Sequence, residues 1–410
     1  MADTGVLRDE NSHSPSCGGD IDIDEDLILQ NILPRLPINE IFKFKLVCKN
    51  WRNLISQDSF SAIHNSVNNP AKTNWHSNSS FYFLADIHRV ISSDDGRNQF
   101  KVPRPLGVLL KGIPSIRGSA NGLIYGLCFH GAGEEIFVCN PIIKQVVYVD
   151  KPKDLCTLAL AYDPHITNGF VGFKIIGVFS YVDHHDEKRF WFEVYSSMTG
   201  EWRALNAPKL KAPPPSSGFG YSQLSSFGFL EESSSVYCKG KVYYSFMENM
   251  IWFDVENDIA GIVPCSDIEG NDLFLYLPTL GVCHEYGNGG EISYSRVTVE
   301  GVIKIWLLKN VGGGDEFEWV IRHDVVLPVV SRFNLAHLPN MNTGTHGSRA
   351  AKAFFPLPYL GGEVLWFKVL HGIHRGSLFS INTRSQELNY HDLKCSSVWP
   401  FTPTLLSCST

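Results

Sequence analysis

The sequence predicts an α+β protein of two domains, a small three-helix unit followed by a large all-β domain. Between residues 27 and 55, apolar side chains recur every three or four positions, which is typical of helices. From about residue 81 onward, runs of four to eight β-branched and aromatic residues alternate with turn-forming Gly, Asn, Asp and Pro, which is typical of strands. The stretch NNPAKTNWHSNSS at 68–80 separates these two patterns.

The expected domain boundaries follow from these changes of pattern. Residues 1–20 are polar and show no periodicity, so we expect a disordered N-terminal tail there. We expect the helical unit at 21–66, a linker at 67–80, the all-β domain at 81–395 and a C-terminal tail at 396–410.

Composition and charge exclude several classes of protein. The net charge of −7 argues against nonspecific binding to nucleic acid or to an anionic membrane, and no run of about 18 apolar residues predicts a membrane span. The ten cysteines show none of the close pairs that zinc sites or redox motifs use. Without a signal-peptide pattern, we expect reduced thiols and a location in the cytoplasm, the nucleus or both.

Apolar residues of the helical unit lie on two sides. One stripe, with steps of three and four, consists of Ile41, Phe44, Cys48, Trp51 and Ile55. Other apolar residues lie off that stripe: Phe42, Leu46, Val47 and Leu54. A single packing partner cannot bury both sides. The stripe also predicts that Cys48 is a buried structural thiol.

Two prolines are expected to shape this unit. Pro34 should end or kink the first helix near Leu33, because a proline ring clashes with the preceding turn. Pro37 should fix the turn between helices.

The all-β region repeats. Five segments share an apolar strand, a polar turn and a second strand, and the first strands end at Asn140, Ser196, Asp254, Leu307 and Asn382. The spacings between these anchor residues are 56, 58, 53 and 75. A period near 50 with several strands per unit predicts a kelch-like β-propeller of four-stranded blades. We expect six blades, with the chain ends supplying one and an insertion at 334–352; the alternative is a pair of β-sandwiches.

No pattern of catalytic or cofactor-binding residues stands out, so we predict no catalytic, cofactor or metal site. HExxH, GxSxG, Walker A and GxGxxG motifs are absent. His184 and His185 adjoin two aspartates, but neighbouring side chains on a strand point to opposite faces, so we interpret this stretch as a polar loop. Trp202, Trp319 and Trp366 are expected in the core rather than in a ligand cage.

Specific segments resemble a known family. The stretch DEDLILQNILPRLPINEIFKFKLVCKNWRNLISQDSF at 24–60 resembles an F-box, although the usual opening Leu-Pro is missing. GSANGLIYGL, VCNPIIKQV, AYDPHITNGFVGFKIIGV and FEVYSSMTGEWRAL resemble, in order, segments of the F-box-associated β-propeller of plant F-box proteins. The resemblance spans about residues 22–392.

This resemblance implies a partner for the second apolar side of the helical unit. A unit of about 40 residues buries little surface by itself. F-boxes bind a Skp-type adaptor, which links them to cullin and RING subunits. The adaptor-binding residues implied here are Ile28, Ile32, Leu33, Leu36, Pro37, Ile41, Phe42, Val47, Cys48 and Trp51. The alternative is that this side packs on the chain's own propeller.

Three functions are therefore compared. The first is a non-catalytic substrate receptor of an SCF-type ubiquitin ligase, whose propeller binds an unidentified target protein. The second is a non-ligase interaction scaffold with a degenerate F-box. The third is a propeller enzyme such as a glycosidase, which requires carboxylates that converge at one end of the channel.

Overall fold

The computed structural model describes most of the chain. Described are residues 27–67, 82–85, 89–92, 99–101 and 110–408, apart from 111, 132, 163–171, 183, 186, 206–209, 212–233, 247–248, 266–277, 286–289, 299–300, 311–316, 328–352, 371–375, 396–397 and 402–403. The expected N-terminal tail, residues 68–80 of the linker expected at 67–80, and the insertion at 334–352 lie outside these residues, whereas Val67 is the last residue of a helix. The longest helix in the described part has ten residues, too few to cross a membrane.

The helical unit, residues 27–67, consists of short helices. They are η1 (Ile28–Ile32, π-helical), η2 (Leu33–Arg35, 3₁₀), α2 (Ile38–Phe44), α3 (Lys49–Ile55) and α4 (Asp58–Val67). As Pro34 predicts, the first helix changes to a 3₁₀ turn at Leu33 and ends before Leu36, which is extended. Pro37 precedes the first turn of α2, as expected of a proline at a helix start.

The prediction of one continuous apolar stripe from Ile41 to Ile55 was wrong. The chain turns between α2 and α3, and Cys48 is extended (φ −153°, ψ 169°). Cys48 is the N-cap of α3, and its Sγ accepts a hydrogen bond from the backbone N–H of Trp51 at 3.4 Å. Cys48 is therefore exposed instead of buried. An N-cap residue has non-helical backbone angles, so Cys48 does not continue the helical periodicity on which the predicted stripe was based.

Strands that are consecutive in the chain form five antiparallel sheets, named here blades 1 to 5. Blade 1 contains β4 (Ile113–Ala120), β5 (Leu123–His130), β6 (Gly133–Asn140) and β7 (Gln145–Asp150). Blade 2 contains β8 (Leu155–Ala161), β9 (Lys174–Val182), β10 (Lys188–Ser196), β11 (Glu201–Ala204) and β12 (Leu210–Lys211). Blade 3 contains β13 (Ser235–Cys238), β14 (Lys241–Phe246), β15 (Asn249–Asp254) and β16 (Ile259–Pro264). Blade 4 contains β17 (Thr279–Cys283), β18 (Glu291–Val297), β19 (Val302–Asn310) and β20 (Phe317–Val326). Blade 5 contains β21 (Ala353–Pro356), β22 (Val364–Leu370), β23 (Gly376–Asn382) and β24 (Leu388–Cys395).

A further sheet joins the two ends of the all-β region. This closing sheet has the order β25-β1-β2-β3, from β25 (Val398–Phe401), β1 (Tyr82–Ala85), β2 (Arg89–Ser92) and β3 (Gln99–Lys101). β25 pairs antiparallel with β1, with Tyr82 opposite Phe401. The boundary predicted at residue 395 is therefore corrected, because the expected C-terminal tail contributes a strand. The structure thus has five blades that are contiguous in sequence instead of the six expected, and the chain ends build the closing sheet between blades 5 and 1.

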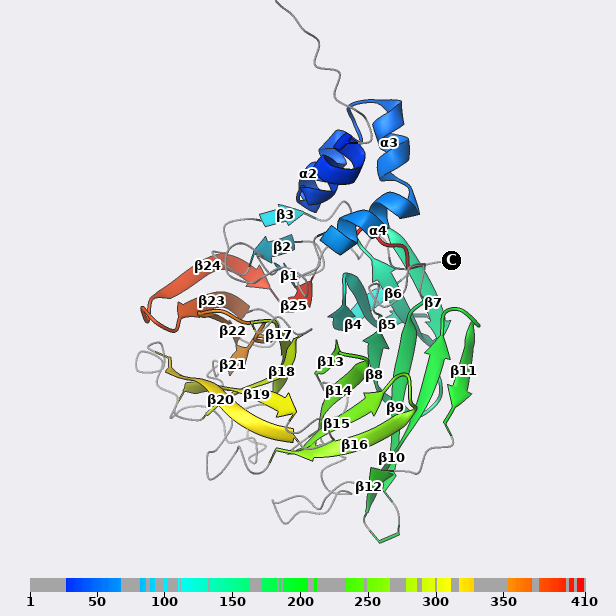
Figure 1. Cartoon of the computed structure of the whole chain (residues 1–410). Helices are drawn as coiled ribbons and strands as arrows, with labels where there is room; N and C mark the ends of the chain where they lie inside the picture. The colour runs from blue at the N-terminus through cyan, green and yellow to red at the C-terminus, as the bar shows by residue number, and fades with distance from the viewer. Residues whose placement is uncertain are drawn as a thin grey trace, which may run out of the picture.

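The sheets surround a common centre, which is the arrangement of a β-propeller rather than of two sandwiches (Figure 1). The hydrophobic core is divided into layers between neighbouring blades. One layer joins Val138 of blade 1 to Ile175 of blade 2, and the next joins Phe192 of blade 2 to Phe253 of blade 3. Each strand thus contributes side chains to both neighbouring layers, because successive residues alternate between the faces of a sheet.

The predicted anchor residues stabilise equivalent turns. Oδ1 of Asn140 accepts the N–H of Ile142 at 2.9 Å, and the corresponding side chains of Ser196, Asp254 and Asn382 accept an N–H two residues onward. These are Asx turns or their serine equivalent at the end of the third strand of a blade. Leu307 was wrong as the fourth anchor: it lies inside β19, which ends at Asn310.

Candidate functional site

One side of the helical unit packs on blade 1. A single hydrophobic cluster combines side chains from both domains: Leu33, Ile38, Ile41, Ile55 and Phe60 with Leu110, Ile124, Cys128, Phe137, Cys139, Ile142, Phe401 and Leu405. Leu33 and Ile41 have only 1% and 0% of their surface exposed. The chain's own propeller therefore covers part of the apolar surface for which the sequence implied an external partner.

The turn between α2 and α3 remains exposed. Leu46 and Val47 have 76% and 62% of their surface exposed. Their backbone is ordered by N–H bonds from Leu46 to the carbonyl of Lys43 (3.0 Å) and from Val47 to that of Phe44 (3.1 Å). Nε of Arg52 also donates to the carbonyl of Lys45 at 3.1 Å. Two adjacent large apolar side chains are thus held outward by a well-bonded turn, which makes this turn a candidate surface for binding another protein.

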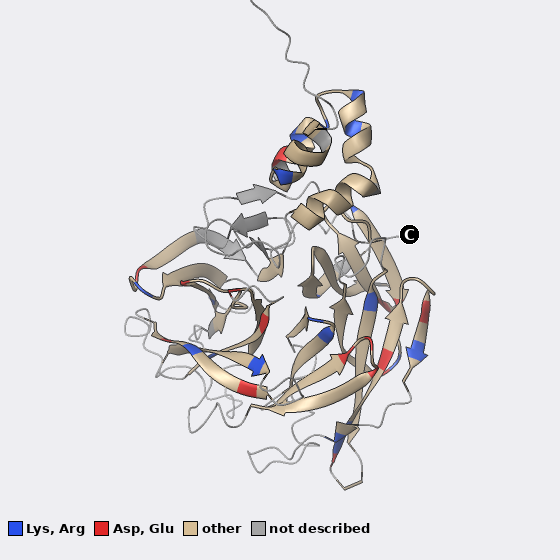
Figure 2. Cartoon of the chain, in the orientation of Figure 1, with Lys and Arg blue, Asp and Glu red and all other residues tan. Residues whose placement is uncertain are grey.

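Basic side chains surround this turn. Lys43 and Arg52 lie before and after it, and Lys49 begins α3; all three are exposed. Lys43 also contacts Glu40, with Nζ 2.8 Å from Oε1. Figure 2 shows the blue segments of Lys and Arg on α2 and α3. We name this set, Leu46, Val47 and Cys48 with Lys43, Lys49 and Arg52, the α2–α3 surface. Its charge favours an acidic partner.

The residues predicted to bind an adaptor fall into three groups. Exposed are Ile32, Pro37, Val47 and Cys48. Partly buried against the cluster with blade 1 are Ile28, Leu36, Phe42 and Trp51. Leu33 and Ile41 are buried, so their assignment to the contact surface is corrected: their side chains pack between the helices and the propeller. The sequence pattern could not reveal this, since core and interface residues are equally apolar.

Two exposed apolar residues were missed. Leu46 was recognised as lying off the stripe but was not assigned to the site, and Leu27, with 48% of its surface exposed, was counted only as part of the helical pattern. Its position off the stripe did not single out Leu46, because Phe42 also lies off the stripe and yet packs against the cluster with blade 1.

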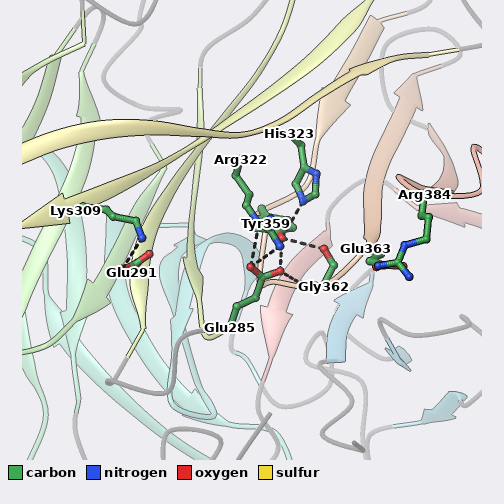
Figure 3. Close-up of polar contacts among 9 residues, drawn as sticks. All are labelled: Glu285, Glu291, Lys309, Arg322, His323, Tyr359, Gly362, Glu363 and Arg384. Atoms are coloured by element: carbon green, nitrogen blue, oxygen red, sulfur yellow. Dashed lines mark hydrogen bonds and ion pairs between the residues drawn. The ribbon is translucent and has the colours of Figure 1, made fainter. Parts of the chain in front are cut away.

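A separate cluster of polar side chains links blades 4 and 5 (Figure 3). Glu285 follows β17, Arg322 and His323 belong to β20, and Tyr359 and Gly362 precede β22. Oε1 of Glu285 accepts the Tyr359 hydroxyl at 2.7 Å and the N–H of Gly362 at 2.6 Å. Oε2 accepts Nε of Arg322 at 3.0 Å. Nε2 of His323 lies 3.0 Å from the Tyr359 hydroxyl.

The electrostatics of this cluster, named here the Glu285 clasp, indicate a structural role in holding blades 4 and 5 together. Burial alone raises the pKa of Glu285, but hydrogen bonds from Arg322, Tyr359 and Gly362 lower it overall. Burial and the bond to Glu285 raise the pKa of the Tyr359 hydroxyl. The carboxylate thus stays charged and the phenol stays protonated. With both carboxylate oxygens occupied, Glu285 is a poor general base, and the cluster provides little support for a propeller enzyme.

The structure also places the histidine pair and the tryptophans that the sequence analysis considered. His184 and His185 lie in the turn between β9 and β10, and in the described part of the chain no group of His, Cys, Asp and Glu could hold a metal ion. Of the three tryptophans expected in the core, Trp366 is buried and stacks on His391. Trp202 and Trp319 are only partly buried and pack against the edges of inter-blade clusters.

The fold and the α2–α3 surface define a β-propeller protein with an N-terminal helical module that exposes a basic and apolar turn. Comparison with known families identifies the module and the propeller separately. Residues 24–62 match the F-box domain, and residues 96–339 match the β-propeller of F-box proteins like At3g26010. The second match covers more than half of the chain, which therefore belongs to the plant F-box proteins with a C-terminal propeller.

Curated relatives from Arabidopsis thaliana support the same family. F-box protein At5g07610 is 28% identical over 277 residues, which are 64% of this chain and 61% of that protein. F-box protein At3g26010 is 28% identical over 184 residues, 43% of this chain and 42% of that protein. The chain thus spans less than two thirds of the curated relatives that it matches. A solved structure, TolB from Acinetobacter baumannii, covers 83% of this chain and 71% of its own length at 9% identity and a TM-score of 0.38.

Proposed function

We propose that the protein is a substrate-recognition subunit of an SCF-type ubiquitin ligase. Its F-box would bind a Skp-type adaptor through the α2–α3 surface, and the adaptor would connect it to cullin and RING subunits. The observation that carries this proposal is the outward position of Leu46 and Val47, at 76% and 62% exposure, within a matched F-box. An adaptor that covers this pair would remove two adjacent apolar side chains of the F-box from water.

The mechanism would be proximity rather than chemistry. The propeller would hold a target protein while the F-box fixes the complex to the scaffold, so that lysines of the target reach a high effective concentration near the ubiquitin-charged enzyme. The protein would then need neither a catalytic site nor a cofactor. A location in the cytoplasm or the nucleus belongs to the same proposal.

We also propose that the closing sheet acts as a sixth blade. Its innermost strand β25 contacts β4 of blade 1, and its order β25-β1-β2-β3 follows the same four-stranded plan as the contiguous blades. A ring joined by strands from both chain ends leaves no open sheet face at the junction.

A binding measurement with matched variants tests the adaptor role. The full chain should bind a purified plant Skp-type adaptor, and Val47→Asp should weaken binding at least about tenfold, because an interfacial apolar anchor is replaced by a charge. The control is Val326→Asp on β20, since Val326 is 63% exposed, almost the same as Val47. It should bind as the parent does. Equal binding by Val47→Asp and the parent, or no binding by the parent, contradicts the ligase proposal.

The alternative is a non-ligase, kelch-like scaffold with a degenerate F-box. One observation favours it: Leu33 and Ile41 are already buried in the cluster shared with blade 1, so part of the apolar surface is occupied within the chain. A parent chain that folds and fails to bind the adaptor supports this alternative.

A further inference from the structure

Residues 404–408 lie between the F-box and blade 1, after the closing strand β25. Thr404, Leu405 and Cys408 have only 1%, 4% and 1% of their surface exposed. Figure 1 shows the C-terminal end of the chain beside α4 and blade 1. The chain therefore returns, after passing through all the blades, to the helical unit near its beginning.

Blade 1 holds this C-terminal segment through side chains at one turn. Nδ2 of Asn140 donates to the carbonyls of Thr404 at 3.0 Å and Leu406 at 2.8 Å. Oε1 of Gln145 accepts the N–H of Cys408 at 3.0 Å and the hydroxyl of Ser407 at 2.8 Å. A turn that elsewhere only connects two strands thus also anchors a distant part of the chain at blade 1.

The choice of Asn at this anchor is informative. Asp254 of blade 3 makes the corresponding turn through Oδ1, but a carboxylate cannot donate to backbone carbonyls. Asn140 makes the same turn through Oδ1 and uses its amide NH₂ for the C-terminal segment. Its side chain is fully buried, with 0% exposed, so both functions are performed in a dry environment where lost bonds are costly.

The opposite side of the segment contacts the F-box. Oγ1 of Thr404 donates to Oδ1 of Asn65 in α4 at 3.4 Å. Leu405 and Phe401 belong to the hydrophobic cluster that contains Leu33 and Ile41 of the helical unit. The segment is consequently a shared packing layer: polar contacts bind it to blade 1, and Leu405 packs in the cluster that blade 1 and the F-box share.

We infer that residues 404–408 are a positioning element that fixes the orientation of the F-box on the propeller. Without them, the closing strand can still pair with β1, but the F-box loses Leu405 from its core and a direct connection to blade 1. The consequence for the ligase rests on the proposed function: the segment sets where a propeller-bound target stands relative to the ubiquitin-charged enzyme.

Hydrogen exchange of the full chain tests this inference without an adaptor or a target. Two variants are compared with the parent: a chain with 404–410 deleted, and Leu405→Asp. The matched control is Leu46→Asp, the same change at a residue with 76% of its surface exposed instead of 4%. In both variants, amides of α4 and of the Asn140 turn should exchange about tenfold faster or more, because local opening becomes easier. Amides of β15 and β19, in blades 3 and 4, should be unchanged, and the control should match the parent.

Two results would overturn the inference. Unchanged exchange in α4 in both variants would mean that the segment does not hold the F-box. A uniform increase across all blades would mean that it stabilises the whole ring rather than the position of one domain. Failure of the adaptor to bind the parent chain would refute the proposed function while leaving this exchange result intact, so the two failures are distinguishable.

Discussion

The indole Nε1 of Trp202 donates a hydrogen bond to the backbone carbonyl of Asp150 at 3.2 Å, linking the outer strand of blade 2 to the last residue of blade 1. The same link recurs between blades 4 and 3, where Nε1 of Trp319 donates to the carbonyl of Pro264 at 3.1 Å. In each case a tryptophan on a fourth strand bonds to the end of the preceding blade's fourth strand. These contacts connect the fourth strands of neighbouring blades.

The first prediction concerns these tryptophan links. Trp202→Phe keeps most of the aromatic packing and removes the donor, so the free energy of unfolding should fall by about 0.5–1.5 kcal/mol, the usual net contribution of one hydrogen bond. Trp319→Phe should have a similar effect. Because the two sites lie in different blade pairs, the double variant should show nearly additive losses in urea unfolding. A loss well above the sum would indicate that the two blade pairs are energetically coupled.

The second prediction concerns the charge of the α2–α3 surface. Reversing Lys49 and Arg52 to Glu should slow association with a Skp-type adaptor, and the rate of the parent should fall as salt increases, because exposed charges act over about 10 Å at 0.1 M salt. Reversal of Lys309, which is on β19 and contacts Glu291, is the control. Association rates measured at several salt concentrations decide the question. A rate indifferent to salt and to the reversals would exclude electrostatic steering.

The third prediction is a pH dependence from the Glu285 clasp. The pKa of Glu285 is lowered in the folded state, so the clasp stabilises the protein fully above the unfolded pKa of about 4.3. This contribution should be lost as pH falls through the lower folded pKa. Glu285→Gln should therefore unfold more easily than the parent at pH 7, and the difference should shrink in acid. Thermal melts of both proteins at several pH values from about 3 to about 7, a range that includes the reference pKa of glutamate, check this. A constant difference across this range would contradict it.

The fourth prediction separates the closing strand from the segment after it. Deleting residues 398–410 removes β25 and leaves β1 paired with β2 alone, whereas deleting 404–410 keeps the pairing of β1 with β25. The longer deletion should lower the melting temperature of the propeller much more than the shorter one, because the inner edge of β1 loses its hydrogen-bond partners and the core loses the side chains of β25. Circular dichroism melts of the two chains make the comparison. Equal melting temperatures would show that β25 does not close the ring.

Local sequence determined much of this protein. The alternation of strand residues predicted the blades, and Asn140, Asp254 and Asn382 were recognisable as repeated anchors because an Asx turn is made within three residues. Pro34 predicted the end of the first helix for the same reason, since its effect acts on the turn directly before it. The F-box pattern was equally local.

Only the tertiary structure decided which apolar residues of the F-box pack against the propeller and which are exposed to solvent. Leu33 and Val47 look alike in the sequence, yet one is 1% exposed against the propeller and the other 62% exposed in a turn. The strand at 398–401 had no strong local signal, and it forms because β1, more than 300 positions earlier, offers an unpaired edge. The physical reason is that hydrophobic burial is non-directional: composition shows that a side chain should leave water, whereas its partner depends on where distant parts of the chain meet.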